Sequence, residues 1–141
     1  MPGPTTAPPA AATDSVTWEN VDRTGYVLLT TWKKDGSAIS VPVWAVRDGH
    51  RLLVITDGNS GKAKRIRANG RAALAPSDRR GARLGADIPA HGRQLPGSEV
   101  EPLRPLFHQR YGWQARMIFA FHRIRYRTMN SVLLELTPLD A

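Results

Sequence analysis

The sequence predicts one small, mainly β domain, an antiparallel barrel of about six strands with two helices on its side or across its ends. Three observations predict it. Short runs of β-branched and aromatic residues are separated by turns, two of those turns contain Asp-Gly, and two segments carry helix start and stop signals. The length of 141 residues suits a single domain with one core.

The first half of the chain is predicted to form three consecutive strands in a meander. The strands are expected at residues 25–33, 38–46 and 51–56. The two Asp-Gly turns between them are expected at residues 34–37 and 47–50. The runs lack a helical period and are rich in Val, Ile, Thr and Trp. Because Pro42 cannot donate a ladder hydrogen bond, the second strand is expected at an edge, a bulge or a ligand-facing gap.

A short helix is predicted to begin after Ser60, whose hydroxyl can accept hydrogen bonds from the following amides. Ala63 and Ile66 give this helix an apolar face. Asn69 and Gly70 end it, with glycine in the usual left-handed position.

The second half of the chain is predicted to hold three further strands and a second helix. The strands are expected at residues 71–77, 82–95 and 131–137, with the middle one interrupted by Pro89. Ser98 is expected to cap the helix, with acids in its first turn and with Leu103, Leu106, Phe107 and Tyr111 at a spacing of three to four. Residues 113–127 fit either a helix or a loop.

Several classes of protein are excluded or disfavoured by what the sequence lacks. With no cysteine, there is no disulfide, thiolate metal site or cysteine nucleophile, and a cytoplasmic location is expected. The four histidines show no metal-ligand spacing, so no metal is expected. No apolar run approaches ~20 residues, and no secretory signal pattern is visible. Residues 1–15, rich in Pro, Ala and Thr, are expected to be a disordered tail, and residues 16–141 the domain.

Positive charge is concentrated in two stretches of a chain with a formal net charge of +8. Residues 60–83 carry eight Lys and Arg against Asp78, and residues 102–134 carry six Arg and no acid. Such clusters attract a polyanion: nucleic acid, anionic lipid, or a phosphorylated or polycarboxylate small molecule. Nucleic acid is disfavoured because aromatic residues do not interleave with the cations of the first stretch.

The loop-to-helix junction at Ser60 is the strongest candidate site. A helix N-terminus offers free amides and a partial positive charge, which together bind phosphate. Ser60 adds a hydroxyl, Gly61 allows a ligand to approach the backbone closely, and Lys62 and Arg65 share one helix face. The alternative is a capped surface helix with solvated cations.

The order of these elements resembles the pyridoxamine-phosphate-oxidase-like split β-barrel family, in particular its branch that uses the deazaflavin coenzyme F420. The resemblance rests on four runs within about residues 25–81: residues 29–36, 41–44, 54–57 and 60–71. It implies an FMN-binding-like split barrel and a homodimer with two cofactors at the subunit interface. It also implies a small-molecule substrate and no association with a membrane.

The resemblance also implies which residues bind the cofactor. The second strand of the first hairpin would line the cofactor ring, here through Val41, Pro42, Val43 and Trp44. The phosphate would be held by Thr56, Ser60, Gly61 and Lys62, with Arg65 one turn further along. Since the cofactor carries out the chemistry, the expected function is hydride transfer to an electron-poor small molecule, and no catalytic side chain or proton donor is assigned.

Two departures from the family pattern guide the choice of cofactor. FMN-dependent oxidases of the family have Arg where this chain has Gly61, and the C-terminal Arg that binds their substrate is missing. The basic residues Lys64, Arg67, Arg79 and Arg80 would suit the oligoglutamate tail of F420. The sequence therefore favours F420, with FMN as the alternative cofactor and a non-catalytic cofactor-binding protein as the alternative function.

Overall fold

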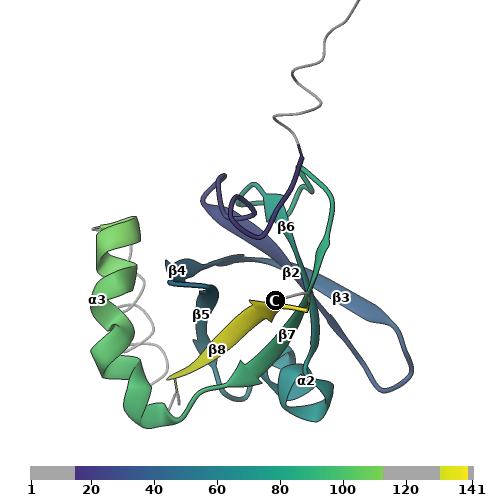
Figure 1. Ribbon diagram of the computed structural model, residues 1–141. Helices are drawn as coiled ribbons and strands as arrows, with labels where there is room; N and C mark the ends of the chain where they lie inside the picture. The colour runs from purple at the N-terminus through teal and green to yellow at the C-terminus, as the bar shows by residue number, and fades with distance from the viewer. Residues whose placement is uncertain (1–14, 113–130, 140–141) are drawn as a thin grey trace, which may run out of the picture.

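A computed structural model of the chain describes residues 15–112 and 131–139. Within them one antiparallel seven-stranded sheet curls into a barrel with the strand order β3-β2-β6-β7-β8-β5-β4 (Figure 1). The strands are β2 (Tyr26–Trp32), β3 (Ala38–Trp44), β4 (Val46–Asp48), β5 (Arg51–Asp57), β6 (Arg71–Ser77), β7 (Ile88–Gln94) and β8 (Ser131–Pro138). The helices are α2 (Gly61–Asn69) and α3 (Val100–Tyr111). The mainly β split barrel predicted from the sequence is confirmed.

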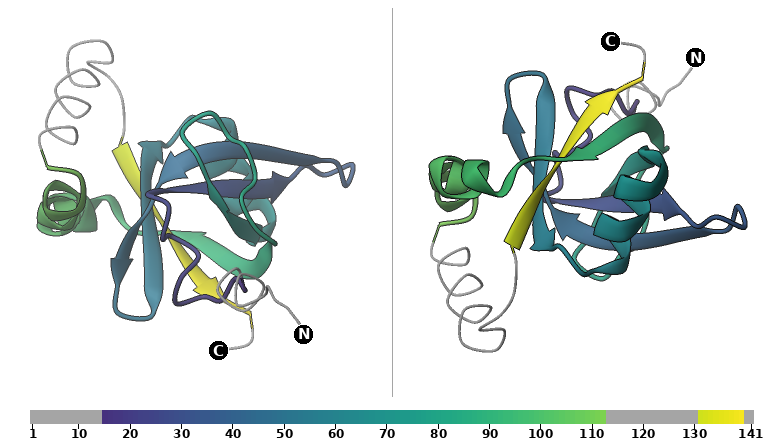
Figure 2. Two further views of the ribbon diagram at one scale, coloured as in Figure 1. Left: turned by 90° about the horizontal axis from the view of Figure 1, so that it is seen from above. Right: turned by 90° about the horizontal axis from the view of Figure 1, so that it is seen from below.

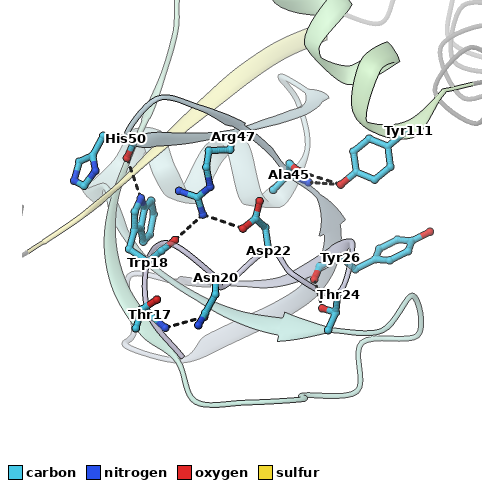
Figure 3. Close-up of polar contacts among 10 residues, drawn as sticks. All are labelled: Thr17, Trp18, Asn20, Asp22, Thr24, Tyr26, Ala45, Arg47, His50 and Tyr111. Carbon is cyan, nitrogen blue, oxygen red and sulfur yellow. Dashed lines mark hydrogen bonds and ion pairs between the residues drawn. The ribbon is translucent and has the colours of Figure 1, made fainter. Parts of the chain in front are cut away.

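The strand predicted over residues 38–46 is divided at Ala45, which makes the predicted three-strand meander wrong. β3 pairs with β2, whereas β4 pairs with β5, so the two edge strands of the sheet are consecutive in the chain. The hydroxyl of Tyr111 lies at the division (Figure 3): it accepts a hydrogen bond from Ala45 N at 3.1 Å and lies 3.0 Å from Ala45 O. The Tyr111 hydroxyl thus hydrogen-bonds with the N–H and C=O groups of Ala45, which leave the strand ladder at the bend. The expectation that Pro42 lies on an edge strand is confirmed.

Apolar side chains fill the interior of the barrel. The segment before β2 lies at one end of the barrel and α2 at the other (Figure 1). At one end the segment before β2 inserts Trp18 and Val21, which are 5% and 0% exposed. At the other end α2 inserts Ala63 and Ile66. This N-terminal segment, which the sequence analysis did not assign, is held by the indole of Trp18, which donates a hydrogen bond to His50 O at 2.9 Å (Figure 3).

A second apolar cluster lies between the outer face of the sheet and α3. It contains Val46, Leu53 and Leu133 from three strands and the fully buried Phe107 from the helix. The apolar spacing predicted for this helix is confirmed. The predicted cap is wrong: Ser98 lies inside a 3-10 turn over Gly97–Glu99 that leads into α3, and the cap position falls on Glu99 without a side-chain hydrogen bond.

The remaining boundaries agree with the sequence except before β7. Residues 82–87 form a loop with an isolated bridge between Ser77 and Arg83, and β7 begins at Ile88. α2 begins and ends as predicted, with Ser60 as its N-cap and Gly70 at φ 69°. The tail expected at residues 1–15 falls outside the described residues except for Ser15, and the undecided segment 113–127 lies wholly outside them. The domain division therefore stays a prediction.

Candidate functional site

The predicted anion-binding residues lie together where β5 leads into α2. Thr56, near the end of β5, is 8% exposed and donates a hydrogen bond to Ser60 Oγ at 3.3 Å. Ser60 Oγ in turn accepts from Ala63 N at 3.3 Å. The Ser60 hydroxyl proton and the amides of Gly61 and Lys62 have no acceptor among the described residues, so they are free to donate to an anion.

Two cations flank this helix start. Both Lys62 and Arg65 are half-buried, and neither side chain has an ion-pair partner among residues 15–112 and 131–139. Burial lowers the pKa of the Lys62 ammonium, the nearby charge of Arg65 lowers it further, and the charge of Asp57 opposes the shift. Two adjacent cations in a partly desolvated position favour a bound anion.

The Arg65 guanidinium is fixed across the first residue of α2. Its Nε donates to Thr31 Oγ1 at 2.6 Å, and the Thr31 side chain is 1% exposed on β2. A Cβ placed on Gly61 would lie 2.5 Å from Arg65 NH1. Gly61 stands where the FMN-dependent oxidases of the family have arginine, and it leaves room for the guanidinium of Arg65.

The four residues predicted to line the cofactor ring occupy the edge strand β3 and point to both of its faces. Val43 packs against the barrel interior. Because side chains alternate along a strand, Val41 shares that face, and Pro42 and Trp44 lie on the other. All four can contact one ring only along the unpaired edge of β3, since its other edge pairs with β2.

The indole of Trp44 is already engaged on one side. It stacks on the ring of Tyr111 with a centroid distance of 4.1 Å and an interplanar angle of 4°. Tyr26 lies opposite Trp44 on β2, with a distance of 6.4 Å between the ring centroids and an interplanar angle of 58°. Packing against Tyr111 therefore accounts for one face of the Trp44 indole.

The sheet register connects the two parts of the site. Thr31, which holds Arg65, lies opposite Ile39 on β3, and Val41 is the next residue of β3 on the same face. From Ile39 to Trp44 the strand runs roughly 17 Å away from this point. β3 therefore extends from the cations of α2 toward the aromatic rings of Tyr26, Trp44 and Tyr111. One elongated ligand can reach both.

The four cations expected to bind one tail do not form one groove. Lys64 and Arg67 lie on α2, before β6, whereas Arg79 and Arg80 follow β6 at its other end (Figure 1). Seven residues of strand, roughly 20 Å, separate the pairs. Arg67 also donates to Gly58 O at 2.9 Å and to Gln94 Oε1 at 2.6 Å. An open groove beside it is lined by residues 66–70 and 91–94, away from Ser60.

Thr31 is the residue of the site that sequence reasoning missed. Its signal is weak: a pair of threonines, Thr30 and Thr31, ends the apolar run of β2, and one of them must face the barrel interior. Its partner Arg65 is 34 positions away, beyond the reach of local pattern analysis. Among the described residues no three metal-ligating side chains gather, and none of their helices is long and apolar enough to cross a membrane.

The curled sheet and the helix at its end define a split β-barrel protein, and the cations at the helix start form its candidate anion site. The family model described as Pyridoxamine 5'-phosphate oxidase matches residues 18–138. The chain belongs to this family. No curated protein matches the sequence.

Solved structures share the fold at low sequence identity. A conserved hypothetical protein from Mycobacterium tuberculosis matches with a TM-score of 0.64 and 13% identity over 89% of this chain and 83% of that one. The heme storage protein HutZ from Vibrio cholerae matches with a TM-score of 0.62 and 14% identity over 85% of each chain. The F420-H2 dependent reductase FDR-A matches with a TM-score of 0.55 and 19% identity over 79% and 93%.

Proposed function

We propose that this protein is an oxidoreductase that binds a phosphate-bearing flavin-type cofactor, with the phosphate at the start of α2 and the ring along β3. The observation that carries the proposal is the pair Lys62 and Arg65. Both are half-buried beside the unpaired amides of α2, and no described carboxylate pairs with either. The Ser60 hydroxyl, which accepts a hydrogen bond from Thr56, forms with the first amides of α2 and these cations a donor set that fits a phosphate group.

The cofactor that we propose is F420, with FMN as the alternative. The formal net charge of +8 and the exposed Lys64 beside the site favour the ligand with more negative charge. A structural neighbour is named as an F420-H2 dependent reductase. When bound, the cofactor would supply hydride transfer to an electron-poor organic acceptor.

The residues of the chain have distinct tasks in this proposal. Lys62 and Arg65 neutralise the phosphate, and Ser60 orients it through its hydroxyl. Val41, Pro42, Val43 and Trp44 position the ring along the free edge of β3. The packed strand excludes water from one side of the ring, and the other side is left for the acceptor.

We further propose a homodimer with the cofactor at the subunit interface. A neighbour of 20% identity and TM-score 0.58 is described as a domain-swapped dimer. The free edge of β3 and the half-buried Tyr26 and Trp44 lie on the surface that a partner would cover. Sedimentation velocity with and without cofactor measures this directly, and a monomer under both conditions contradicts it.

Titration of the purified protein with F420 and, separately, with FMN tests the cofactor. Lys62→Ala is expected to weaken binding of the preferred cofactor at least about tenfold, because a charge-assisted contact to phosphate is lost. Lys34→Ala, which removes an exposed lysine from the β2–β3 turn, is the matched control and should change affinity less than about twofold. Binding of neither cofactor refutes the proposal.

Turnover distinguishes an enzyme from a cofactor carrier. The carrier function is considered because the neighbour HutZ is named as a heme storage protein. The assay follows oxidation of the reduced cofactor with a panel of electron-poor acceptors, including quinones. Acceptor-dependent oxidation above the rate in buffer supports an oxidoreductase. Tight binding with no acceleration for any acceptor supports a carrier.

A further inference from the structure

Arg65 differs from the five described arginines that form ion pairs in what its side chain contacts. The guanidinium groups of Arg47, Arg51, Arg83, Arg93 and Arg104 all end on carboxylates. Arg65 instead makes one hydrogen bond, through Nε, to the hydroxyl of Thr31. Its two terminal nitrogens have no hydrogen-bond or ion-pair partner in the part of the chain that the structure describes.

The position of this guanidinium depends on two neighbouring residues. Thr31 is 1% exposed, so its hydroxyl is a rigid anchor within β2 rather than a mobile surface group. Gly61 leaves the space that the guanidinium occupies, because a Cβ there would lie 2.5 Å from NH1. The guanidinium consequently lies against the first turn of α2, next to the unpaired amides and the Lys62 ammonium.

A half-buried guanidinium with unused donors is costly unless a ligand completes it. The neighbouring cation increases that cost, since Lys62 and Arg65 repel each other. Asp57, the carboxylate whose charge Lys62 senses, does not pair with either cation; its Oδ1 accepts a hydrogen bond from Asn59 N at 3.0 Å. The described residues therefore supply no counter-charge for either cation, which leaves both available to an anion.

We infer that Thr31 and Gly61 are positioning residues for the anion site: Thr31 holds Arg65 and Gly61 leaves room for it, so that its two terminal nitrogens face a phosphate bound at the start of α2. The inference rests on the proposed function and extends it, because neither residue needs to touch the cofactor ring. Bidentate guanidinium contacts require this kind of fixed orientation, which a flexible surface arginine does not provide.

Three single variants test the inference by titration with F420 and FMN. Thr31→Val keeps the shape of the side chain and removes the hydroxyl, and it is expected to weaken binding about tenfold. Thr31→Ser keeps the hydroxyl and should restore affinity to within about twofold. Thr30→Val is the matched control: it removes an equally buried hydroxyl of β2 that contacts Ser40 and not Arg65.

Two further measurements separate positioning from general damage to the fold. Riboflavin and the deazaflavin chromophore lack the phosphate, so their affinities should change less than about twofold in Thr31→Val. The double variant of Thr31→Val with Arg65→Ala should bind no more weakly than Arg65→Ala alone, since both changes remove the same contact. Additive losses, or equal weakening for the phosphate-free ligands, overturn the inference.

Pyrophosphate distinguishes failure of this inference from failure of the proposed function. If neither cofactor binds but pyrophosphate does, and Thr31→Val weakens it about tenfold, the positioning role stands and the flavin assignment falls. If a cofactor binds and Thr31→Val leaves its affinity unchanged, the function stands and the inference falls. If neither cofactor nor pyrophosphate binds, both are refuted.

Discussion

The hydroxyl of Tyr111 connects the last residue of α3 to the bend in the barrel. Its oxygen accepts a hydrogen bond from Ala45 N at 3.1 Å (Figure 3). Its proton is donated to Gly25 O at 2.7 Å or to Ala45 O at 3.0 Å. Because Ala45 is 1% exposed, water has little access to these backbone groups. Removing the hydroxyl should therefore leave a buried amide without a partner.

We expect Tyr111→Phe to lower the free energy of unfolding by about 2 kcal/mol, the usual range for a buried unsatisfied donor being ~1–3 kcal/mol. The ring remains, and so does its stack on Trp44 at 4.1 Å, so the loss isolates the hydroxyl. Urea unfolding at pH 7, followed by tryptophan fluorescence, measures it. With an m-value of roughly 2 kcal/mol/M, the midpoint should fall by about 1 M.

Tyr26→Phe is the control, because the Tyr26 hydroxyl makes no hydrogen bond to a described residue; it should change stability by less than about 0.5 kcal/mol. Burial raises the pKa of the Tyr111 hydroxyl to about 12. Its contribution is thus present below about pH 10 and lost as the pH rises toward about 12, a limb that Tyr111→Phe should lack. Equal midpoints for the two variants would refute the role given to this hydroxyl.

Two other substitutions test the barrel away from the bend. Burial alone would raise the pKa of the Glu135 carboxyl, but hydrogen bonds from Arg51 and Arg93 outweigh it and lower the pKa below 4.5. Stability from this group is present above about pH 4.5 and lost as the pH falls, so Glu135→Gln should cost about 2 kcal/mol at pH 7 and flatten the acid limb of urea midpoints; an unchanged acid limb contradicts this. Trp18→Ala should cost ~3–5 kcal/mol by thermal or urea unfolding, and Trp18→Phe less than half as much. A cost below about 1 kcal/mol for Trp18→Ala would show that the N-terminal segment packs outside the cooperative unit.

Local signals were enough to predict most of the elements. Hydrophobic runs and Asp-Gly turns located β2, β3 and β5, because the pattern along a strand and the turn residues are set within a few positions. The same holds for α2, where Ser60 and Gly70 define both ends. The candidate anion site could be proposed from the sequence for the same reason, since its donors lie within one turn of a helix.

What could not be predicted depends on partners distant in the sequence. Ala45 suits a strand, and the division there becomes visible only with Tyr111, which is 66 positions away. Trp18 and Val21 occupy turns with no helical or strand period, so their burial follows from the open end of the barrel rather than from their neighbours. Ser98 has the composition of a cap, but the 3-10 turn before α3 moves the helix start beyond it.

The place of β8 in the sheet has a consequence for how the chain is made. β8 is last in the chain order, yet it lies between β7 and β5, and it pairs with both (Figure 2). Leu52 and Leu136, which face each other across β5 and β8, are 84 positions apart. During synthesis, β5 and β7 therefore present unpaired edges until the ribosome has released the C-terminal strand. Closure of the barrel is then a late, long-range event, the kind of topology in which folding is slow and exposed to aggregation.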